Sequence, residues 1–267
     1  MILKLDEWYH NQITEYLRKE EDFNLFVIGD IERYGYDNQF FNIWGDLNTV
    51  GDINGLLIQY FDLLTLYSYD NRDLTCFIDH INSLPFSNIN GKIETLKYIE
   101  PYINYDRKRI VNFCILKNRS YLNEYKLDSD VKKIRFGKIG KVLNLYEDIN
   151  EFQKPTIQSI RENLRTGRGY YIEKDKKIVS MAKSTSESST HAMIVGVGTH
   201  PMYRNKGYAT KCIVKLCNNL INEKKKPCLF YDNEDAGKIY KKLGFKEVGQ
   251  WVIYYRWRIK RVENTRF

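Results

Sequence analysis

The stretch Val195–Lys211, "VGVGTHPMYRNKGYATK", joins an apolar, strand-like segment to the start of a helix-like segment. The strand pattern ends at Thr199, and Pro201 helps to stop it because proline has no N–H to donate. Arg204 and Lys206 add positive charge beside the first helical turn, where the helix dipole already repels cations. Exposed N–H groups at a helix start attract anions. The stretch therefore predicts an anion site.

Two small residues refine this site. Gly207 lets the backbone approach a bulky group closely, and Ala209 keeps the second position of the helix small. A phosphate at the start of a helix fits this arrangement. A plain structural turn is the alternative reading of the glycine alone.

The segments around this stretch alternate between strand and helix patterns. Residues 191–199, 227–232 and 245–257 read as strands, and 208–226 and 234–244 read as helices. Upstream, 131–136 reads as a strand, 137–149 and 154–167 as helices, and 168–185 as a hairpin with its turn at 174–177. Helices between strands predict a mixed α/β (α+β) sheet flanked by helices.

The first half of the chain shows weaker patterns. Residues 5–20 and 74–84 read as helices, 24–35 as an apolar segment with a helix or turn, 53–68 as two strands, and 109–118 as one strand. A polar segment at 121–130 marks the expected boundary. We therefore expect an acidic domain at 1–130 and a basic domain at 131–267.

The loop Arg204–Ala209, "RNKGYA", is similar to the R/Q-x-x-G-x-G/A pyrophosphate loop of the GCN5-related N-acetyltransferase (GNAT) superfamily. "VGVGTHPMY" resembles the fourth strand of that family and its following bend, and Asn233 with "AGKIYKKLGF" resembles its closing helix and last strands. The resemblance covers about 131–267, with a finer likeness to the branch with glycine acyltransferase-like C-terminal domains. It implies a largely antiparallel acyl-CoA N-acyltransferase fold. The first half is compatible with a degenerate second domain of this type, which would give two in tandem.

The resemblance also implies roles for particular residues. The fourth strand would splay from the fifth, and Val197 and Thr199, with Gly198 between them, would hydrogen-bond the pantetheine arm of acetyl-CoA as an added strand does. Amides of the loop would hold its pyrophosphate, Asn233 would bond the arm near the thiol, and Tyr240 would protonate the departing thiolate. The loop residues are Arg204, Asn205, Lys206, Gly207, Tyr208 and Ala209.

The acceptor amine must lose a proton before it attacks, because an alkyl ammonium has a pKa of about 10.4. The segment 191–199 contains no glutamate, although the family often places a base there. The candidates for the base are His191, Glu187, Glu162 or a chain of waters. An exposed or capping role is the alternative for His191, and a packing role is the alternative for Tyr240.

Composition limits the other possibilities. The five cysteines form no CxxC pair and the four histidines are scattered, so we expect reduced thiols, no metal site and a cytoplasmic location. No apolar run of about 18 residues predicts a membrane span. Residues 1–130 hold 13 Lys/Arg against 21 Asp/Glu, and residues 131–267 hold 29 against 13. This asymmetry suggests two units with different tasks.

The sequence therefore predicts an enzyme that moves an acetyl group from acetyl-CoA to the primary amine of a small molecule or peptide, as a monomer or homodimer. A non-catalytic acyl-CoA sensor is one alternative. An acetyltransferase associated with RNA or the ribosome is another, based on the basic half, on Lys224–Lys226 and on "YYRWRIKR" at 254–261. We expect ordinary packing for the terminal segment, a solvated helix end for the lysines, and no nucleic acid partner. The acidic half would wall off the acceptor, select it, or stabilise the other half.

Overall fold

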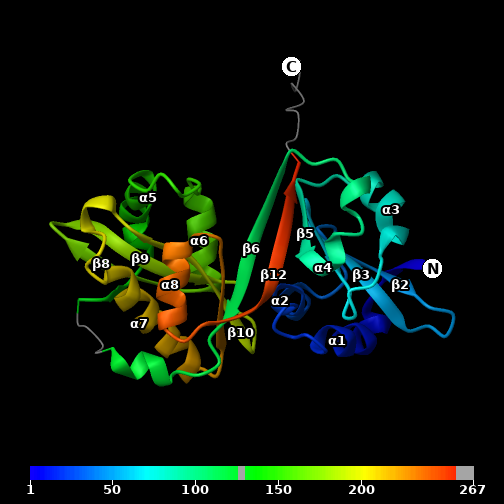
Figure 1. Cartoon of the computed structure of the whole chain (residues 1–267), viewed down its shortest axis with the longest axis horizontal. Coiled ribbons are helices and arrows are strands. Elements are labelled where there is room, and N and C mark those ends of the chain that lie inside the picture. Colours follow the sequence, from blue (N-terminus) through cyan, green and yellow to red (C-terminus); the bar gives the residue numbers. More distant parts are fainter. Residues whose placement is uncertain (126–129, 257–267) are drawn as a thin grey trace, which may run out of the picture. The chain divides into compact units, whose positions relative to one another are not determined.

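The computed structural model describes residues 1–125 and 130–256. The chain divides into two compact units. Unit 1 consists of Met1–Val111 and Gly249–Phe267, and unit 2 consists of Asn112–Val248. Figure 1 labels the helices and strands of both units.

Unit 2 contains a sheet of six strands in the order β6-β11-β10-β9-β8-β7. The strands β7 to β10 are antiparallel neighbours, β10 and β11 are parallel, and β11 and β6 are antiparallel. The bounds are β6 Arg107–Ile115, β7 Lys132–Lys133, β8 Gly169–Lys174, β9 Lys177–Thr185, β10 His191–Thr199 and β11 Lys226–Tyr231. The expected mixed, largely antiparallel sheet is confirmed.

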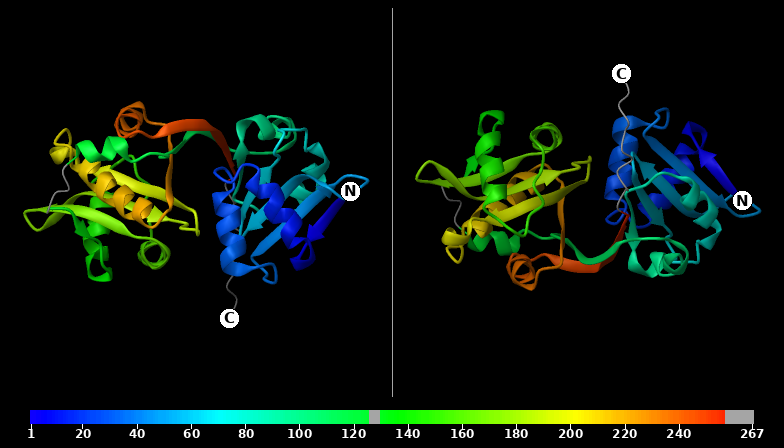
Figure 2. Two further views of the ribbon diagram at one scale, coloured as in Figure 1. Left: turned by 90° about the horizontal axis from the view of Figure 1, so that it is seen from below. Right: turned by 90° about the horizontal axis from the view of Figure 1, so that it is seen from above.

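Two separate apolar clusters place the helices of unit 2 on the two faces of this sheet (Figure 2). The first joins Ala182 and Ile194 to α7 and α8, and the second joins Met181 to α5 and α6. Because successive residues of a strand point to opposite faces, Ala182 and Met181 belong to different clusters. The helices are α5 Ile139–Glu147, α6 Ile157–Thr166, α7 Tyr208–Asn222 and α8 Glu234–Lys242.

Unit 1 repeats the same strand pattern. Its strands β1 to β4 are antiparallel neighbours, β4 and β5 are parallel, and β5 and β12 are antiparallel. The strands are β1 Ile2–Leu5, β2 Phe41–Leu47, β3 Ile53–Tyr60, β4 Leu63–Tyr67, β5 Asn88–Lys92 and β12 Lys246–Tyr255. The helices are α1 His10–Arg18, α2 Leu25–Tyr34, α3 Ile78–Ser83 and α4 Ile93–Leu96. The sequence patterns did not predict the strands β1, β2 and β5.

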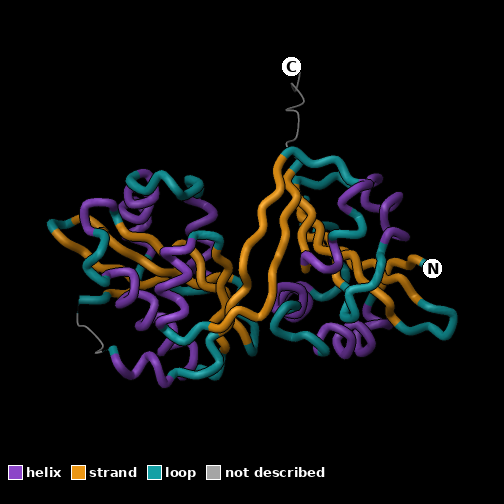
Figure 3. The backbone as a smooth tube through the Cα atoms, in the orientation of Figure 1, coloured by secondary structure: helices purple, strands orange, loops and turns teal. Residues whose placement is uncertain are grey.

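The units exchange their sixth strands. The strand β12 follows α8 in the chain, yet its residues from Trp251 onward pair with β5 of unit 1. The strand β6 follows the segments of unit 1, yet Asn112–Ile115 pair with β11 of unit 2. Both are long continuous strands in Figure 3. We expected one boundary between residues 130 and 131, but the units divide between 111 and 112 and between 248 and 249. The reason is that strand pairing decides which residues each unit holds.

Three further observations concern the expected class of protein. No helix among residues 1–125 and 130–256 is long and apolar enough to cross a membrane. None of the five cysteines is part of a disulfide, and Cys76 alone among them is exposed. The basic, aromatic segment expected at 254–261 lies outside the described residues from position 257 onward.

Candidate functional site in unit 2

The slot beside β10 begins where its pairing with β11 ends. His191–Ile194 pair with Lys226–Leu229, and no later residue of β10 is in register with β11. On its other edge β10 continues to pair with β9, but the register shifts between Val195 and Gly198. Gly196 lies in this bulge with a φ of 59°. The two parallel strands therefore separate from Val195 onward, at the position where the sequence predicted the splay.

The residues after the bulge are held from the β9 side. The Ser180 hydroxyl donates to the Gly198 carbonyl at 3.1 Å and lies 2.9 Å from the Thr199 hydroxyl. Val197 is half-buried against the α7 cluster. The Thr199 carbonyl accepts a hydrogen bond from Arg204 Nε at 3.3 Å. The predicted pantetheine-binding residues thus lie together on one short segment with an open strand edge.

The loop before α7 presents a run of unpaired amides. Pro201–Tyr203 form one 3-10 turn in which the Met202 N–H donates to the His200 imidazole at 3.2 Å, and the Arg204 backbone N–H donates to the Pro201 carbonyl at 3.3 Å. In the described part of the chain, the amides from Asn205 to Thr210 have no acceptor, and no side chain caps α7. The run of unpaired amides therefore starts at Asn205, one residue later than the predicted anion-binding loop.

Two residues of this loop have left-handed backbone conformations. Asn205 has a φ of 63° and Gly207, the N-cap of α7, has a φ of 72°. A Cβ added at Gly207 would meet nothing within 4 Å, so the space in front of the helix is open. A helix start with free amides and open space fits a phosphate group.

Positive charge lies at the edge of this space. Lys206 Nζ lies 5.3 Å from the centre of the Tyr203 ring, while Arg204 forms an ion pair with Glu151 at 3.0 Å. All loop residues from Arg204 to Gly207 are exposed. The charge expected from Arg204 is therefore shared with a carboxylate.

Asn233 is the N-cap of α8, and Tyr240 lies on that helix. The Asn233 side-chain oxygen caps the helix by accepting from the amides of Asp235 and Ala236. Its side-chain nitrogen has no acceptor among the residues described, so this nitrogen is available to donate. The Tyr240 side chain is buried in the α7 cluster, with ring centres 5.8 Å from Tyr231 and 5.9 Å from Phe245. Burial raises the pKa of Tyr240 to about 12, which keeps the phenol protonated at neutral pH.

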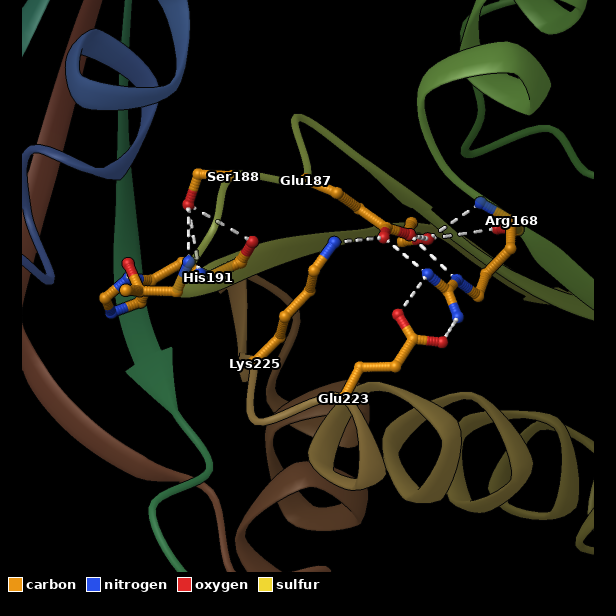
Figure 4. Close-up of polar contacts among 8 residues, drawn as sticks. Arg168, Glu187, Ser188, His191, Glu223 and Lys225 are labelled. Atoms are coloured by element: carbon orange, nitrogen blue, oxygen red, sulfur yellow. Dashed lines mark hydrogen bonds and ion pairs between the residues drawn. The ribbon is translucent and has the colours of Figure 1, made fainter. Parts of the chain in front are cut away.

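Glu187 is the centre of an ion-pair cluster (Figure 4). Its carboxylate lies 2.7 Å from Arg168 and 2.9 Å from Lys225, and Arg168 also pairs with Glu223. Burial alone would raise the pKa of Glu187, but hydrogen bonds from Arg168, Ser184 and Lys225 outweigh it and lower that pKa. A carboxylate held in this way is a poor proton acceptor. Lys225 is thus an ion-pair partner and not the solvated helix end that was expected.

The other two sequence candidates for the base are also poorly placed. His191 is fully buried, and its ring lies apart from the Glu187 cluster, with Nδ1 2.8 Å from the Thr190 hydroxyl (Figure 4). The alternative of an exposed histidine is therefore wrong. His191 lies five residues before Gly196, roughly 16 Å along a strand. Glu162 is half-buried on α6 and is engaged by Gln158 and Arg165.

Sequence reasoning missed Lys183 and Tyr146. Lys183 is 2% exposed on β9, opposite Val195, and its Nζ lies 5.0 Å from the centre of the Tyr146 ring. A Cβ added at Gly196 would lie 2.5 Å from the Tyr146 hydroxyl and 3.6 Å from Lys183 Nζ. Both polar groups therefore meet the bulge directly. The available signal was a lysine inside the apolar run "IVSMAKST". Because lysine is rarely buried without a partner, a lysine at a position with buried neighbours is unusual.

Unit 1 has a cavity of its own, with a volume of about 620 Å³. It is lined by Ile2, Lys4, Trp44, Cys76, Asp79, His80 and Ser83, none of which the sequence singled out. The predicted site residues all belong to unit 2.

Comparison with known proteins now assigns the family. The family model described as GNAT acetyltransferase matches residues 87–254 of the chain. The chain belongs to the GNAT acetyltransferase family. Acyl transfer is therefore the general chemistry of this fold, and the matched GNAT segment contains all of unit 2. No curated protein matches the chain.

Solved GNAT structures share the fold. A tandem GNAT protein from the clavulanic acid biosynthesis pathway is 10% identical, with 95% of this chain and 97% of that chain covered and a TM-score of 0.60. A GCN5-related N-acetyltransferase from Sphaerobacter thermophilus is 12% identical, with 95% and 94% covered and a TM-score of 0.65. A GNAT-family protein from Novosphingobium aromaticivorans is 19% identical over 57% of this chain and 65% of that chain, with a TM-score of 0.50. The GNAT fold with two tandem domains is confirmed.

Proposed function

We propose that this GNAT protein transfers an acetyl group from acetyl-CoA to a primary amine in a ternary complex. The proposal rests on one observation: the open edge of β10 is followed directly in the chain by the unpaired amides of Asn205–Thr210. The first suits the amide-bearing arm of coenzyme A, and the second suits its pyrophosphate. Both lie on one continuous segment of unit 2.

The protein's own groups then have distinct tasks. Val197 and Thr199 hold the arm, the loop amides hold the phosphates, and Asn233 donates its side-chain N–H toward the thiol end. Backbone amides at the bulge face the place where negative charge develops on the acyl oxygen. Tyr240 keeps its proton at neutral pH and donates it to the leaving sulfur.

Calorimetry with acetyl-CoA, CoA and dephospho-CoA tests binding, and a panel of primary amines scored by thiol release tests transfer. We expect acetyl-CoA to bind and at least one amine to release thiol. An absence of binding would reduce the loop before α7 to a structural turn. Binding without transfer to any amine would favour the acyl-CoA sensor over the enzyme.

A further inference from the structure

Lys183 is a buried cation without a counter-charge. Among the described residues no hydrogen-bond acceptor or carboxylate contacts its Nζ, whose neighbours are the Tyr146 ring and the Gly196 backbone. Burial alone lowers the pKa of Lys183 to about 8. Burial without compensation is costly for a charged amine, so retention of lysine here points to a task for its nitrogen.

Lys183 and Tyr240 lie on opposite faces of the sheet of unit 2. Lys183 is two residues from Met181, so its side chain lies on the α5 and α6 face, where Tyr146 contacts it. Tyr240 lies in the cluster of α7 and α8 on the other face. The attacking amine loses a proton and the leaving sulfur gains one, so the transfer uses two separate proton-transfer groups. Lys183 and Tyr240 are separate in this way.

Other titratable groups near Lys183 are few and already engaged. The α5 face presents Tyr146, whose pKa burial raises to about 12, and β8 presents Tyr171 on the same face. On α6 the Glu162 carboxylate is held by Arg165. After α5, Glu151 pairs with Arg204, and Asp148 lies 3.6 Å from His200. No carboxylate in the described chain therefore fixes Lys183 as a cation.

We propose that the neutral amine of Lys183 takes the proton from the acceptor ammonium at the bulge of β10. The acceptor nitrogen then forms a C–N bond to the acyl carbon as the C–S bond breaks, and the electron pair leaves on sulfur. The sulfur takes the Tyr240 proton, the second proton of the nitrogen replaces it on Tyr240 through solvent, and Lys183 returns its proton to water. One proton is released per transfer.

This inference rests on the proposed function, so its first test does not depend on the acceptor. Trace labelling of the full chain with acetic anhydride from pH 6 to 11, read by mass spectrometry, reports the titration of each lysine. We expect Lys183 to reach half of its limiting reactivity near pH 8, well below the ordinary 10.5 of a lysine. A half-maximal Lys183 reactivity at the ordinary value overturns the proposal.

The second test measures transfer from acetyl-CoA to benzylamine, which is protonated at neutral pH, and to trifluoroethylamine, which is already neutral. We expect Lys183→Met to lower kcat/KM for benzylamine about 100-fold at pH 8 and to change that for trifluoroethylamine less than threefold. Lys183→Arg should behave like Lys183→Met, because arginine keeps its proton. Lys177→Met is the matched control and should match the wild type.

The outcomes separate the two proposals. Equal losses with both amines, or a wild-type rate in Lys183→Arg, overturn the role of Lys183 and leave the transferase in place. If the wild-type protein binds acetyl-CoA but releases thiol with neither amine nor any member of the wider panel, the proposed transferase activity is overturned. The labelling experiment then tests the titration of Lys183 by itself. Acetyl-CoA affinity of the folded variants within twofold of the wild type shows that Lys183→Met has not disturbed the slot.

Discussion

At the scale of single residues, Gly207 decides whether a phosphate can approach α7. Its φ of 72° favours glycine, and the space in front of it is open. Gly207→Glu brings both bulk and negative charge to the free amides, so we expect acetyl-CoA affinity to fall at least 100-fold by calorimetry. Gly140→Glu, the same change at an exposed glycine of α5, is the control. Unchanged affinity in folded Gly207→Glu would contradict the loop assignment.

Lys183 makes a separate prediction about stability. Its pKa is about 8 in the folded protein against an ordinary 10.5, so between these values the unfolded chain binds more protons than the folded chain. Stability must then rise with pH in this window, by about 3 kcal/mol in full. Urea unfolding of the wild type and Lys183→Met from pH 7 to 10 measures the difference. We expect the unfolding free energy of the wild type to rise with pH relative to that of Lys183→Met. Parallel plots of unfolding free energy against pH would contradict the burial of a lysine with a lowered pKa.

At the scale of elements, the bulge of β10 joins the slot to the helix α5. Any residue at position 196 must adopt a positive φ, and a Cβ there would lie 2.5 Å from the Tyr146 hydroxyl. We expect Gly196→Ala to cost about 1 to 3 kcal/mol of folding free energy and to lower transfer more strongly than binding. Chemical denaturation and thiol release measure these two effects. Gly196→Ala combined with Tyr146→Phe should recover part of the stability, because it removes the clashing oxygen.

The ion-pair cluster fastens the end of α7 to β8 and to the segment after β9. Arg168→Met would leave the buried Glu187 carboxylate with Lys225 and the Ser184 hydroxyl but without Arg168, and we expect a loss of about 3 kcal/mol of folding free energy. Because the pKa of Glu187 is lowered in the folded state, its stabilisation is present above its ordinary pKa and is lost as pH falls through the folded value. Unfolding at pH 7 and pH 3 should therefore show a smaller effect of Arg168→Met in acid. An equal effect at both pH values would contradict the role of the charged pair.

At the scale of the whole molecule, the exchange of β6 and β12 makes the two units unequal. Unit 2 is continuous in the chain, whereas unit 1 needs residues from both ends. Val252 and Tyr254 of β12 are buried in the core of unit 1. We expect the fragment 1–111 to remain unfolded by circular dichroism, and to fold when residues 249–256 are supplied through a short linker.

The same division gives a prediction about binding. All the proposed acetyl-CoA residues lie in Asn112–Val248, so this fragment should bind acetyl-CoA within about tenfold of the full chain. Calorimetry measures the acetyl-CoA affinity of this fragment, and the same fragment carrying Gly207→Glu is the control. Binding that requires unit 1 would show that the site is not contained in unit 2.

Local pattern was enough to predict the helices and strands of unit 2 and the turn before α7, because the residues of each element lie close together in the sequence. The run Tyr208–Asn222 has helical spacing, and the glycine before it is required by its own φ. In unit 1 the short strands β1, β2 and β5 lacked a clear pattern. The sequence also could not place Glu187, whose partners Arg168 and Lys225 are 19 and 38 residues away.

What the sequence by itself determined is the family, the loop proposed to bind phosphate and the order of elements, since these depend on neighbouring residues and backbone conformation. Tertiary structure alone decided which strands complete each sheet and which ionisable groups lie at the slot. The pairing of β12 with β5 joins residues more than 150 positions apart, and the burial of Lys183 depends on a helix, α5, from another part of unit 2. Burial and strand pairing are properties of the packed chain, and they set the chemistry of its side chains.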